Sequence, residues 1–152
     1  MANSIVGTKR NIQILRGLSS DRSLLSCTGN GQTVDLYNID DGSGRQEWNI
    51  SLVPTYDDLY HIMVYGGTSG DNVYLSCNEV GGGVNLYFED DGSGRQRWQV
   101  IPLTSNIPAY YNIKVSGGTG PEWVFLSCTG DGVTVDLYYE DDGSGRQRWQ
   151  LQ

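Results

Sequence analysis

Basic residues and long apolar runs are both scarce in this sequence of 152 residues. Ten Lys and Arg stand against 18 Asp and Glu, so the net charge is −8 at pH 7. Nucleic acids and anionic membranes are bound through basic surfaces, so this charge argues against both partners. No run of 18 apolar residues is present, and a membrane-spanning helix needs one. We therefore expect no nucleic-acid partner and no membrane insertion.

A secretion signal is also lacking. The first seven residues read MANSIVG and contain no apolar signal region, which predicts a cytoplasmic protein unless it is released by a non-classical route. Disorder is not expected, because four Trp and ten Tyr are more aromatics than disordered chains carry. The length suits a single domain over residues 1–152 with its own core.

Only three cysteines are present, an odd number and too few for a disulfide scaffold. They are regularly spaced, because Cys27, Cys77 and Cys128 lie 50 and 51 residues apart. The segment from Leu25 to Trp48, LSCTGNGQTVDLYNIDDGSGRQEW, is identical at 19 of 24 positions to the segment that ends at Trp149. The same step separates Trp48, Trp98 and Trp149, and also Gly17, Gly67 and Gly118. The chain therefore consists of three repeats, approximately 8–53, 58–103 and 109–152.

Each repeat contains four short segments with apolar residues at alternate positions, which is typical of strands. In repeat 1 these pairs are Ile12 and Ile14, Leu25 and Cys27, Val34 and Leu36, and Trp48 and Ile50, with apolar counterparts 50 and 101 residues further on. No segment keeps a 3.6-residue period, so helices should be nearly absent. Twelve strands in three equal units predict an all-β chain folded as a closed barrel with pseudo-threefold symmetry, a β-trefoil. Three blades would not close a propeller.

The end of each repeat carries a Gln-x-Trp motif, at Gln46-Glu47-Trp48, Gln96-Arg97-Trp98 and Gln147-Arg148-Trp149. With the VDLY, VNLY and VDLY segments that lie upstream, the motif resembles the ricin B-chain-like β-trefoil lectins over all three repeats. The resemblance implies a shallow sugar site in each repeat, often for galactose or N-acetylgalactosamine. Two departures alter the site: Ser26-Cys27 and its counterparts stand where the family usually has an Asp sugar anchor, and Arg45 and its counterparts stand where it often has Asn.

The run DDGSGRQ recurs without change at residues 40–46, 90–96 and 141–147. One interpretation is a sugar-binding loop, in which the carboxylates and the Arg hydrogen-bond vicinal hydroxyls. The other is a tight turn, in which Asp starts the turn, Gly takes a positive φ and Arg pairs with Asp. The unchanged copies favour the first, although recent duplication would also keep them alike. The predicted sugar-binding residues are Tyr37, Asp40, Asp41, Gly42 and Arg45, then Tyr87, Asp90, Asp91, Gly92 and Arg95, and then Tyr138, Asp141, Asp142, Gly143 and Arg146.

The residues around the third strand carry the rest of the site prediction. Tyr37 and its counterparts should point outward, either to stack on a pyranose ring or to pack under their own loop. Asp35 and its counterparts, Asn85 and Asp136, also face outward, and we expect solvated polar positions rather than ligand contacts. Gln46 should tie the loop to the barrel, and Trp48 should lie in the core. The cysteines should be reduced and buried as small hydrophobic residues.

Signals for catalysis and for metals are weak. His61 is the only histidine, and Asn11 and Asn112 replace it in the other repeats, so no repeated histidine site exists. Asp40 and Asp41 are adjacent on a glycine-rich loop, without the separate environments that glycoside hydrolysis requires. No Cys-x-x-Cys pair and no EF-type calcium loop are present. We expect a protein that is not an enzyme and that uses no metal and no cofactor.

These features predict a lectin with up to three repeated sites, which cross-links glycoproteins or glycolipids through galactose or N-acetylgalactosamine. The alternative is a β-trefoil that binds protein, such as a protease inhibitor, but inhibitors present one distinctive loop and here that loop occurs three times. A targeting module for a toxin or enzyme on another polypeptide is a third interpretation. The sequence leaves the oligomeric state open between monomer and dimer.

Overall fold

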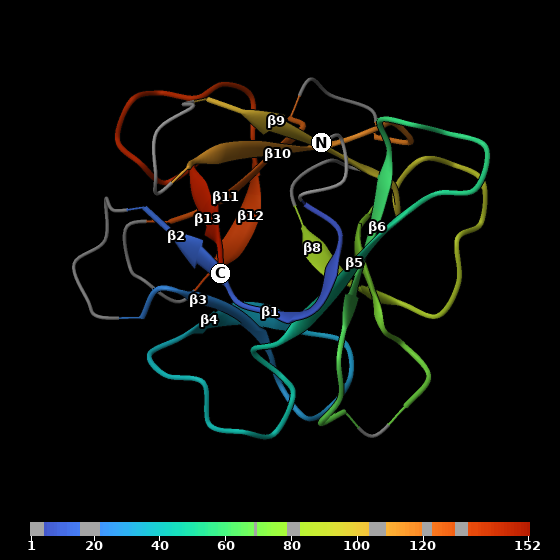
Figure 1. Ribbon diagram of the computed structural model, residues 1–152, viewed down its shortest axis with the longest axis vertical. Helices are drawn as coiled ribbons and strands as arrows, with labels where there is room; N and C mark the ends of the chain where they lie inside the picture. The colour runs from blue at the N-terminus through green and yellow to red at the C-terminus, as the bar shows by residue number, and fades with distance from the viewer. Residues whose placement is uncertain are drawn as a thin grey trace.

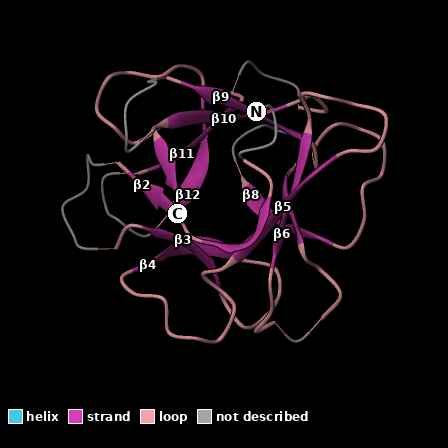
Figure 2. Cartoon of the chain, viewed as in Figure 1, coloured by secondary structure: helices cyan, strands magenta, loops and turns pink. Residues whose placement is uncertain are grey.

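The computed structural model describes residues 5–15, 22–68, 70–78, 83–103, 109–119, 123–129 and 134–152. Within these ranges it contains 13 strands and no helix, and so no helix able to cross a membrane (Figure 2). The strands are β1 (Gly7–Arg10), β2 (Ile12–Ile14), β3 (Leu24–Cys27), β4 (Val34–Tyr37), β5 (Trp48–Leu52), β6 (Tyr60–Val64), β7 (Tyr74–Cys77), β8 (Val84–Tyr87), β9 (Trp98–Pro102), β10 (Tyr111–Val115), β11 (Phe125–Cys128), β12 (Val135–Tyr138) and β13 (Trp149–Leu151). The prediction of an all-β chain is confirmed.

The strands form a barrel and three hairpins. Antiparallel pairing runs in the order β1-β5-β6-β9-β10-β13-β2, and the barrel closes because β1 and β2 adjoin in the sequence. The hairpins β3–β4, β7–β8 and β11–β12 pair with the barrel through β2, β6 and β10. Isolated bridges between Thr33 and Asn85, Gly83 and Asp136, and Asp35 and Thr134 join the hairpins to one another. The three thirds of the chain surround a common centre (Figure 1), and the predicted β-trefoil is confirmed.

Repeat 1 differs from the prediction in its first strand, which is divided into β1 and β2. β1 pairs with β5 and β2 pairs with β13, whereas the single strands β6 and β10 contact both barrel neighbours. Lys9 has a φ of 55°, and the register shifts between Gly7 and Arg10. A residue with positive φ distorts a regular strand, and β1 ends one residue later at Arg10, so Asn11 separates β1 from β2. This is why the structure has thirteen strands and not twelve.

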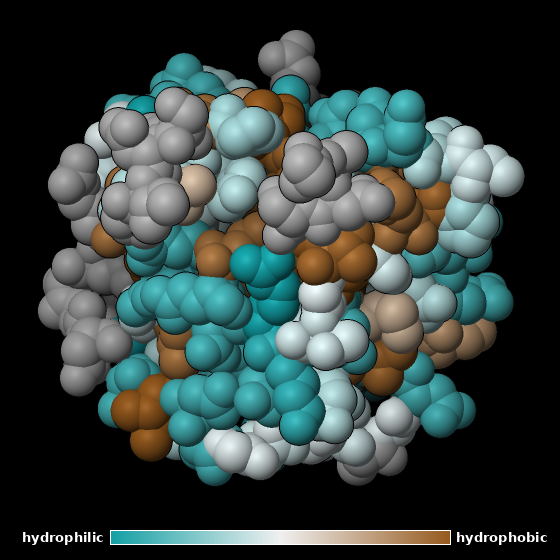
Figure 3. Space-filling view, viewed as in Figure 1, coloured by the Kyte–Doolittle hydropathy of each residue, from teal (hydrophilic) through white to brown (hydrophobic). Residues whose placement is uncertain are grey.

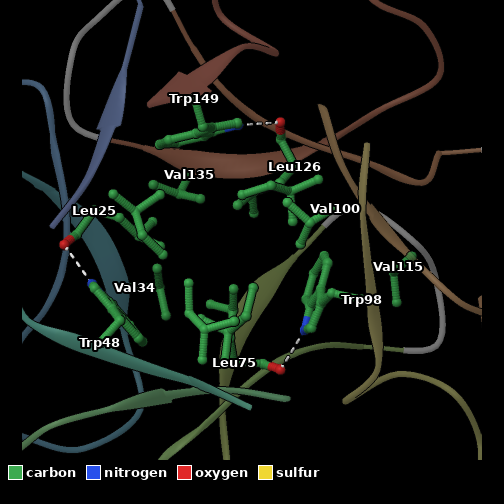
Figure 4. Close-up of a cluster of buried hydrophobic side chains, with 14 of the residues drawn as sticks. Leu25, Val34, Trp48, Leu75, Trp98, Val100, Val115, Leu126, Val135 and Trp149 are labelled. Atoms are coloured by element: carbon green, nitrogen blue, oxygen red, sulfur yellow. Dashed lines mark hydrogen bonds between the residues drawn. The ribbon is translucent and has the colours of Figure 1, made fainter. Parts of the chain in front are cut away.

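Three tryptophans surround the buried aliphatic side chains at the centre of the core (Figure 4). Trp48, Trp98 and Trp149 have no exposed surface. Each indole Nε1 donates to a backbone oxygen of the second strand in the same repeat: Leu25, Leu75 and Leu126 accept at 2.9, 2.8 and 2.9 Å. The polar edge of each ring is thus satisfied inside an apolar core. The predicted core position of the tryptophans is confirmed.

Polar and apolar residues are mixed on the outside. On the face shown in Figure 3, hydrophobic residues lie in small groups among hydrophilic ones. Among the described residues, the most exposed large hydrophobic side chains are Ile39, Phe88 and Tyr139, at 55%, 52% and 49%. All three follow the third strand of their repeat within two residues. Exposed apolar surface is therefore greatest beside the hairpins.

One turn carries a residue that is poorly suited to it. Thr55 has a φ of 72°, Pro54 precedes it, and the Tyr56 N–H donates to the Val53 oxygen at 3.1 Å. This is the geometry of a type II turn, whose third position favours glycine, and a β-branched residue there is strained.

Thr55→Gly should therefore stabilise the fold by about 1 kcal/mol. The substitution removes the backbone strain of threonine, and the entropy that glycine adds to the unfolded chain offsets part of this gain. Thermal unfolding should show a melting temperature higher by roughly 3 °C. Thr68→Gly is the matched control, because Thr68 is not among the residues with positive φ. The control should lower stability, and a Thr55→Gly variant that also melts earlier would contradict the prediction.

Candidate functional site

Each DDGSGR loop (residues 40–45, 90–95 and 141–146) is held by the same internal hydrogen bonds. In repeat 1, Asp40 Oδ1 accepts from the Gly42 N–H at 3.1 Å and Asp41 Oδ1 accepts from the Ser43 N–H at 3.0 Å. Ser43 Oγ accepts from the Arg45 N–H at 3.2 Å, and Arg45 Nη2 pairs with Asp41 Oδ2 at 3.3 Å. The other copies repeat these contacts. The locked turn, the second interpretation of this run, is present in all three repeats.

A buried glutamine joins each loop to a hairpin. Gln46 Oε1 accepts from the Asp41 N–H at 3.1 Å, and Gln46 Nε2 donates to Ser26 Oγ at 2.9 Å. Gln96 and Gln147 make the same two bonds. The prediction that Gln46 ties the loop down is confirmed, but its partner Ser26 lies in the hairpin strand β3 and not in the barrel. Ser26, at the position of the sugar anchor in the family that the sequence resembles, is 2% exposed and supports this glutamine.

The first carboxylate of each loop contacts the barrel. Asp90 Oδ2 lies 2.7 Å from His61 Nε2 and accepts from Arg97 Nε at 2.8 Å. Asn11 and Asn112, the counterparts of His61, donate to Asp40 and Asp141 at 3.1 Å. The lone histidine therefore occupies a position that serves the loop in every repeat.

Hydrogen bonds lower the pKa of several loop carboxylates and so hold them in the ionised form. Burial alone would raise the pKa of Asp90, but hydrogen bonds from Arg97, His61 and the Gly92 N–H lower it to about 2. The pKa values of Asp41, Asp91 and Asp142 are also lowered, chiefly by hydrogen bonds from the serine two residues further along. These carboxylates are engaged in shaping the loop at neutral pH.

In repeats 1 and 2, the arginine of the loop reaches the next repeat. Arg45 Nη1 donates to the Gly67 oxygen at 3.4 Å, and Arg95 Nη1 donates to the Gly118 oxygen at 3.3 Å. Gly67 has a φ of 84°, and a Cβ there would lie 2.6 Å from the Cγ atom of Arg45. Only glycine fits so close an approach with this backbone conformation. The repeated glycine at 67 and 118 is thus explained, whereas Gly17 lies outside the described residues.

A pocket lies between the loop and the hairpin, and we call it the loop pocket. In repeat 2 its volume is about 440 Å³ and in repeat 3 about 250 Å³. The first is lined by Ser76, Cys77, Asn78, Asn85, Tyr87, Arg95 and Gln96, and the second by Ser127, Cys128, Thr129, Asp136, Tyr138, Arg146 and Gln147. Every residue of the second set follows its counterpart by 51 positions. The same set in repeat 1 is Ser26, Cys27, Thr28, Asp35, Tyr37, Arg45 and Gln46.

The predicted site residues divide between the pocket and the loop. The tyrosine and the arginine line the loop pockets of repeats 2 and 3. The acidic residues and the glycine, Asp90, Asp91 and Gly92 with their counterparts, are not among the lining residues and shape the turn beside the pocket. Asn85 and Asp136 line the pockets although they were expected to be ordinary solvated positions. Their alternation with the inward Leu and the outward Tyr was the signal that could have assigned them to the site.

Burial also distinguishes the position of Asp35 from an ordinary surface residue. The Oδ1 atoms of Asp35 and Asn85 are buried without a hydrogen-bond partner. Burial raises the pKa of Asp35, against the opposing effect of Arg22. A partly desolvated polar group beside a pocket is typical of binding sites.

The cysteines are buried in all three repeats, and none of them forms a disulfide bond. Burial raises the pKa of Cys27 and of Cys77 to about 12, which suppresses the thiolate needed for nucleophilic attack or metal binding. In the described parts of the chain, no group of three or more His, Cys, Asp or Glu residues is arranged to hold a metal ion. Besides the buried thiols, the described site therefore consists of hydroxyl, amide, aromatic and guanidinium groups, with the Asp136 carboxylate added in repeat 3.

No protein-family model and no curated protein matches this sequence. Solved structures do share its fold. SeviL bound to the asialo-GM1 saccharide aligns with a TM-score of 0.65 at 12% identity over 96% of this chain and 98% of that one. The designed threefold-symmetric protein ThreeFoil aligns with a TM-score of 0.64 at 20% identity over 93% and 96%. The Polyporus squamosus lectin bound to Neu5Acα2-6Galβ1-4GlcNAc aligns with a TM-score of 0.63 at 18% identity over 96% of this chain and 49% of that one.

The anchor of the loop in repeat 2 gives a prediction about acid stability. Asp90→Asn should lower the free energy of unfolding at pH 7 by about 1 kcal/mol, because the Arg97 and His61 bonds lose their charged acceptor. The folded pKa lies below the ordinary value, so this stabilisation is present above pH 4 and is lost as the pH falls toward about 2. Urea unfolding between pH 7 and pH 2 measures the difference.

Asp40→Asn provides the matched control for that experiment. Repeat 1 has Asn11 and Glu47 in place of His61 and Arg97, so its carboxylate lacks the cationic partner and should contribute less. Equal destabilisation by both substitutions, or a difference that does not shrink in acid, would contradict the assignment.

Proposed function

We propose that the protein is a carbohydrate-binding lectin of the ricin B-chain-like type and not an enzyme. One observation carries the proposal: the loop pocket recurs in two repeats with the same seven positions. Repeat 1 has the residue types of repeat 3 at all seven of these positions and those of repeat 2 at five. An internally repeated pocket is expected of a module that binds a repeated ligand. Two proteins with the same fold, SeviL and the Polyporus squamosus lectin, are bound to saccharides, which supports the same ligand class here.

The groups in the loop pocket match the chemistry of a pyranose. The half-buried tyrosine offers an aromatic face to the C–H side of a sugar ring. Arg95 donates hydrogen bonds, Asn85 can both donate and accept, and the carboxylate of Asp136 accepts from hydroxyls. The acidic residues of the loop contribute by holding the arginine in place through the Asp91–Arg95 type of ion pair.

We further propose galactose or N-acetylgalactosamine as the terminal sugar, because the Gln-x-Trp repeats resemble lectins of that specificity. With up to three sites on one body, the protein would cross-link glycoproteins or glycolipids. A shallow site binds weakly, so the biological response would depend on simultaneous engagement.

Replacing Tyr37, Tyr87 and Tyr138 together by Ala should weaken binding to an immobilised galactose-terminated glycan by about tenfold or more at each site. A glycan array followed by isothermal titration would measure the loss, and circular dichroism would show that the fold persists. Tyr65→Ala is the control, because Tyr65 is exposed, lies against Lys9 and is not among the residues that line the loop pockets of repeats 2 and 3. Retained affinity in the triple variant, or a blank array for the unsubstituted protein, would contradict the proposal.

Multivalency gives a separate prediction. Variants with one intact tyrosine should lose roughly 100-fold in apparent affinity for a dense glycan surface while keeping the affinity of the remaining site for free sugar. Surface plasmon resonance at high and low glycan density compares the two. If dense and sparse surfaces give the same apparent affinity for the unsubstituted protein, the sites do not act together.

A further inference from the structure

A second depression adjoins the loop pocket of repeat 2, and we call it the junction hollow. Its volume is about 550 Å³, and its lining includes Gln32, Thr33, Asn72, Asn85, Tyr87 and Phe88. Asn85 and Tyr87 line both depressions, so the loop pocket and the junction hollow lie next to each other on either side of these two side chains. The repeated loop does not account for this hollow, because Gln32 and Thr33 belong to repeat 1.

The walls of the junction hollow are fixed by the backbone. The Leu86 N–H donates to the Gln32 oxygen at 3.1 Å, and Thr33 bridges to Asn85, which places the tip of the first hairpin against β8. The Val73 N–H donates to the Tyr87 oxygen at 3.0 Å and thereby sets Asn72 on the opposite side. The hollow thus lies at the junction of two repeats and is built from ordered elements.

The surface of the hollow combines an aromatic pair with neutral polar groups. The rings of Tyr87 and Phe88 lie 4.8 Å apart at 40°, and Phe88 is half exposed. Gln32 and Asn72 carry amides, and Thr33 carries a hydroxyl. Stacking surface beside uncharged donors and acceptors suits a second neutral sugar ring.

The other two repeats place a large side chain where repeat 2 has Asn72. In repeat 3 this is Trp123, whose ring lies 5.7 Å from Tyr138 and 6.1 Å from Tyr139. In repeat 1 it is Arg22, whose guanidinium lies 5.8 Å from the ring of Tyr37. The facing wall differs as well, because Gly83 stands opposite Asp136 where Thr33 stands opposite Asn85. Among the residues that the structure describes, open space beside the tyrosine is therefore found in repeat 2.

We propose that repeat 2 binds an oligosaccharide across both depressions, with the terminal sugar in the loop pocket and the next sugar in the junction hollow. Repeats 1 and 3 bind the terminal sugar alone, because Arg22 and Trp123 cover the corresponding place. The side chain at position 72 then determines whether repeat 2 binds one sugar or two. This inference rests on the proposed lectin function and adds a difference in specificity among the three sites.

The test isolates repeat 2 in the full-length chain with Tyr37→Ala and Tyr138→Ala and compares galactose with lactose by isothermal titration. With Asn72 present, lactose should bind about tenfold more tightly than galactose, the gain expected from one stacked ring and its hydrogen bonds. Adding Asn72→Trp should abolish this preference and leave the affinity for galactose within about twofold. Trp is already accommodated at this position in repeat 3, so the variant should fold. Asp71→Trp, at an exposed neighbour outside the lining, is the matched control and should keep the preference.

Nuclear magnetic resonance on the same proteins gives a second readout. The side-chain amide signals of Gln32 and Asn72 should shift with lactose and stay in place with galactose. If galactose binds but lactose is no tighter, or if Asn72→Trp leaves the lactose preference intact, the extended site is overturned while the lectin function stands. If the protein without substitutions binds neither sugar, the galactose-type function fails and the inference fails with it.

Discussion

The architecture of the site depends on one buried amide in each repeat. Gln46 links the backbone of the DDGSGR loop to Ser26 on the second strand, and it is 1% exposed. A buried amide that lost either partner would carry an unsatisfied polar group, which is costly, so loop and hairpin are held at one separation. The loop pocket is the space left between them. The Trp two residues later anchors the same segment in the core through its own hydrogen bond to the second strand.

Contacts between successive repeats extend this constraint around the barrel. The Tyr65 N–H donates to the Glu47 oxygen at 2.8 Å, and Arg45 reaches the backbone at Gly67. Each loop is therefore supported by the start of the next repeat as well as by its own hairpin. One repeat alone would lack half of these partners, which is the usual reason that repeated units are stable only together. Because the same contacts hold each loop, the repeats form similar pockets.

Most of the fold could be predicted from the sequence because its signals are local and occur three times. The period of two in the strands, the buried Trp and the role of Gln46 all follow from positions within one repeat. The division of the first strand at Asn11 could not be predicted, because nothing in the residue types requires the positive φ of the nearby Lys9. Of the two residues Asn85 and Tyr87 in the pocket wall, the sequence predicts only Tyr87, since burial of an outward position depends on neighbours that sequence spacing does not show. The junction hollow was missed because its walls come from two repeats.

The three repeats are most alike where they build the scaffold and least alike around the pockets. The loop sequence and the buried Gln, Ser, Cys and Trp do not vary, whereas the rim carries Arg22, Asn72 and Trp123 at one position and Asn38, Phe88 and Tyr139 at another. Rim side chains can change without loss of a buried hydrogen bond, so substitutions there leave the fold intact. Under the proposed lectin function, a symmetric scaffold with varied rims would hold one kind of sugar in three ways. Different glycans on one target surface could then be engaged by one rigid molecule, with each site contributing its own preference.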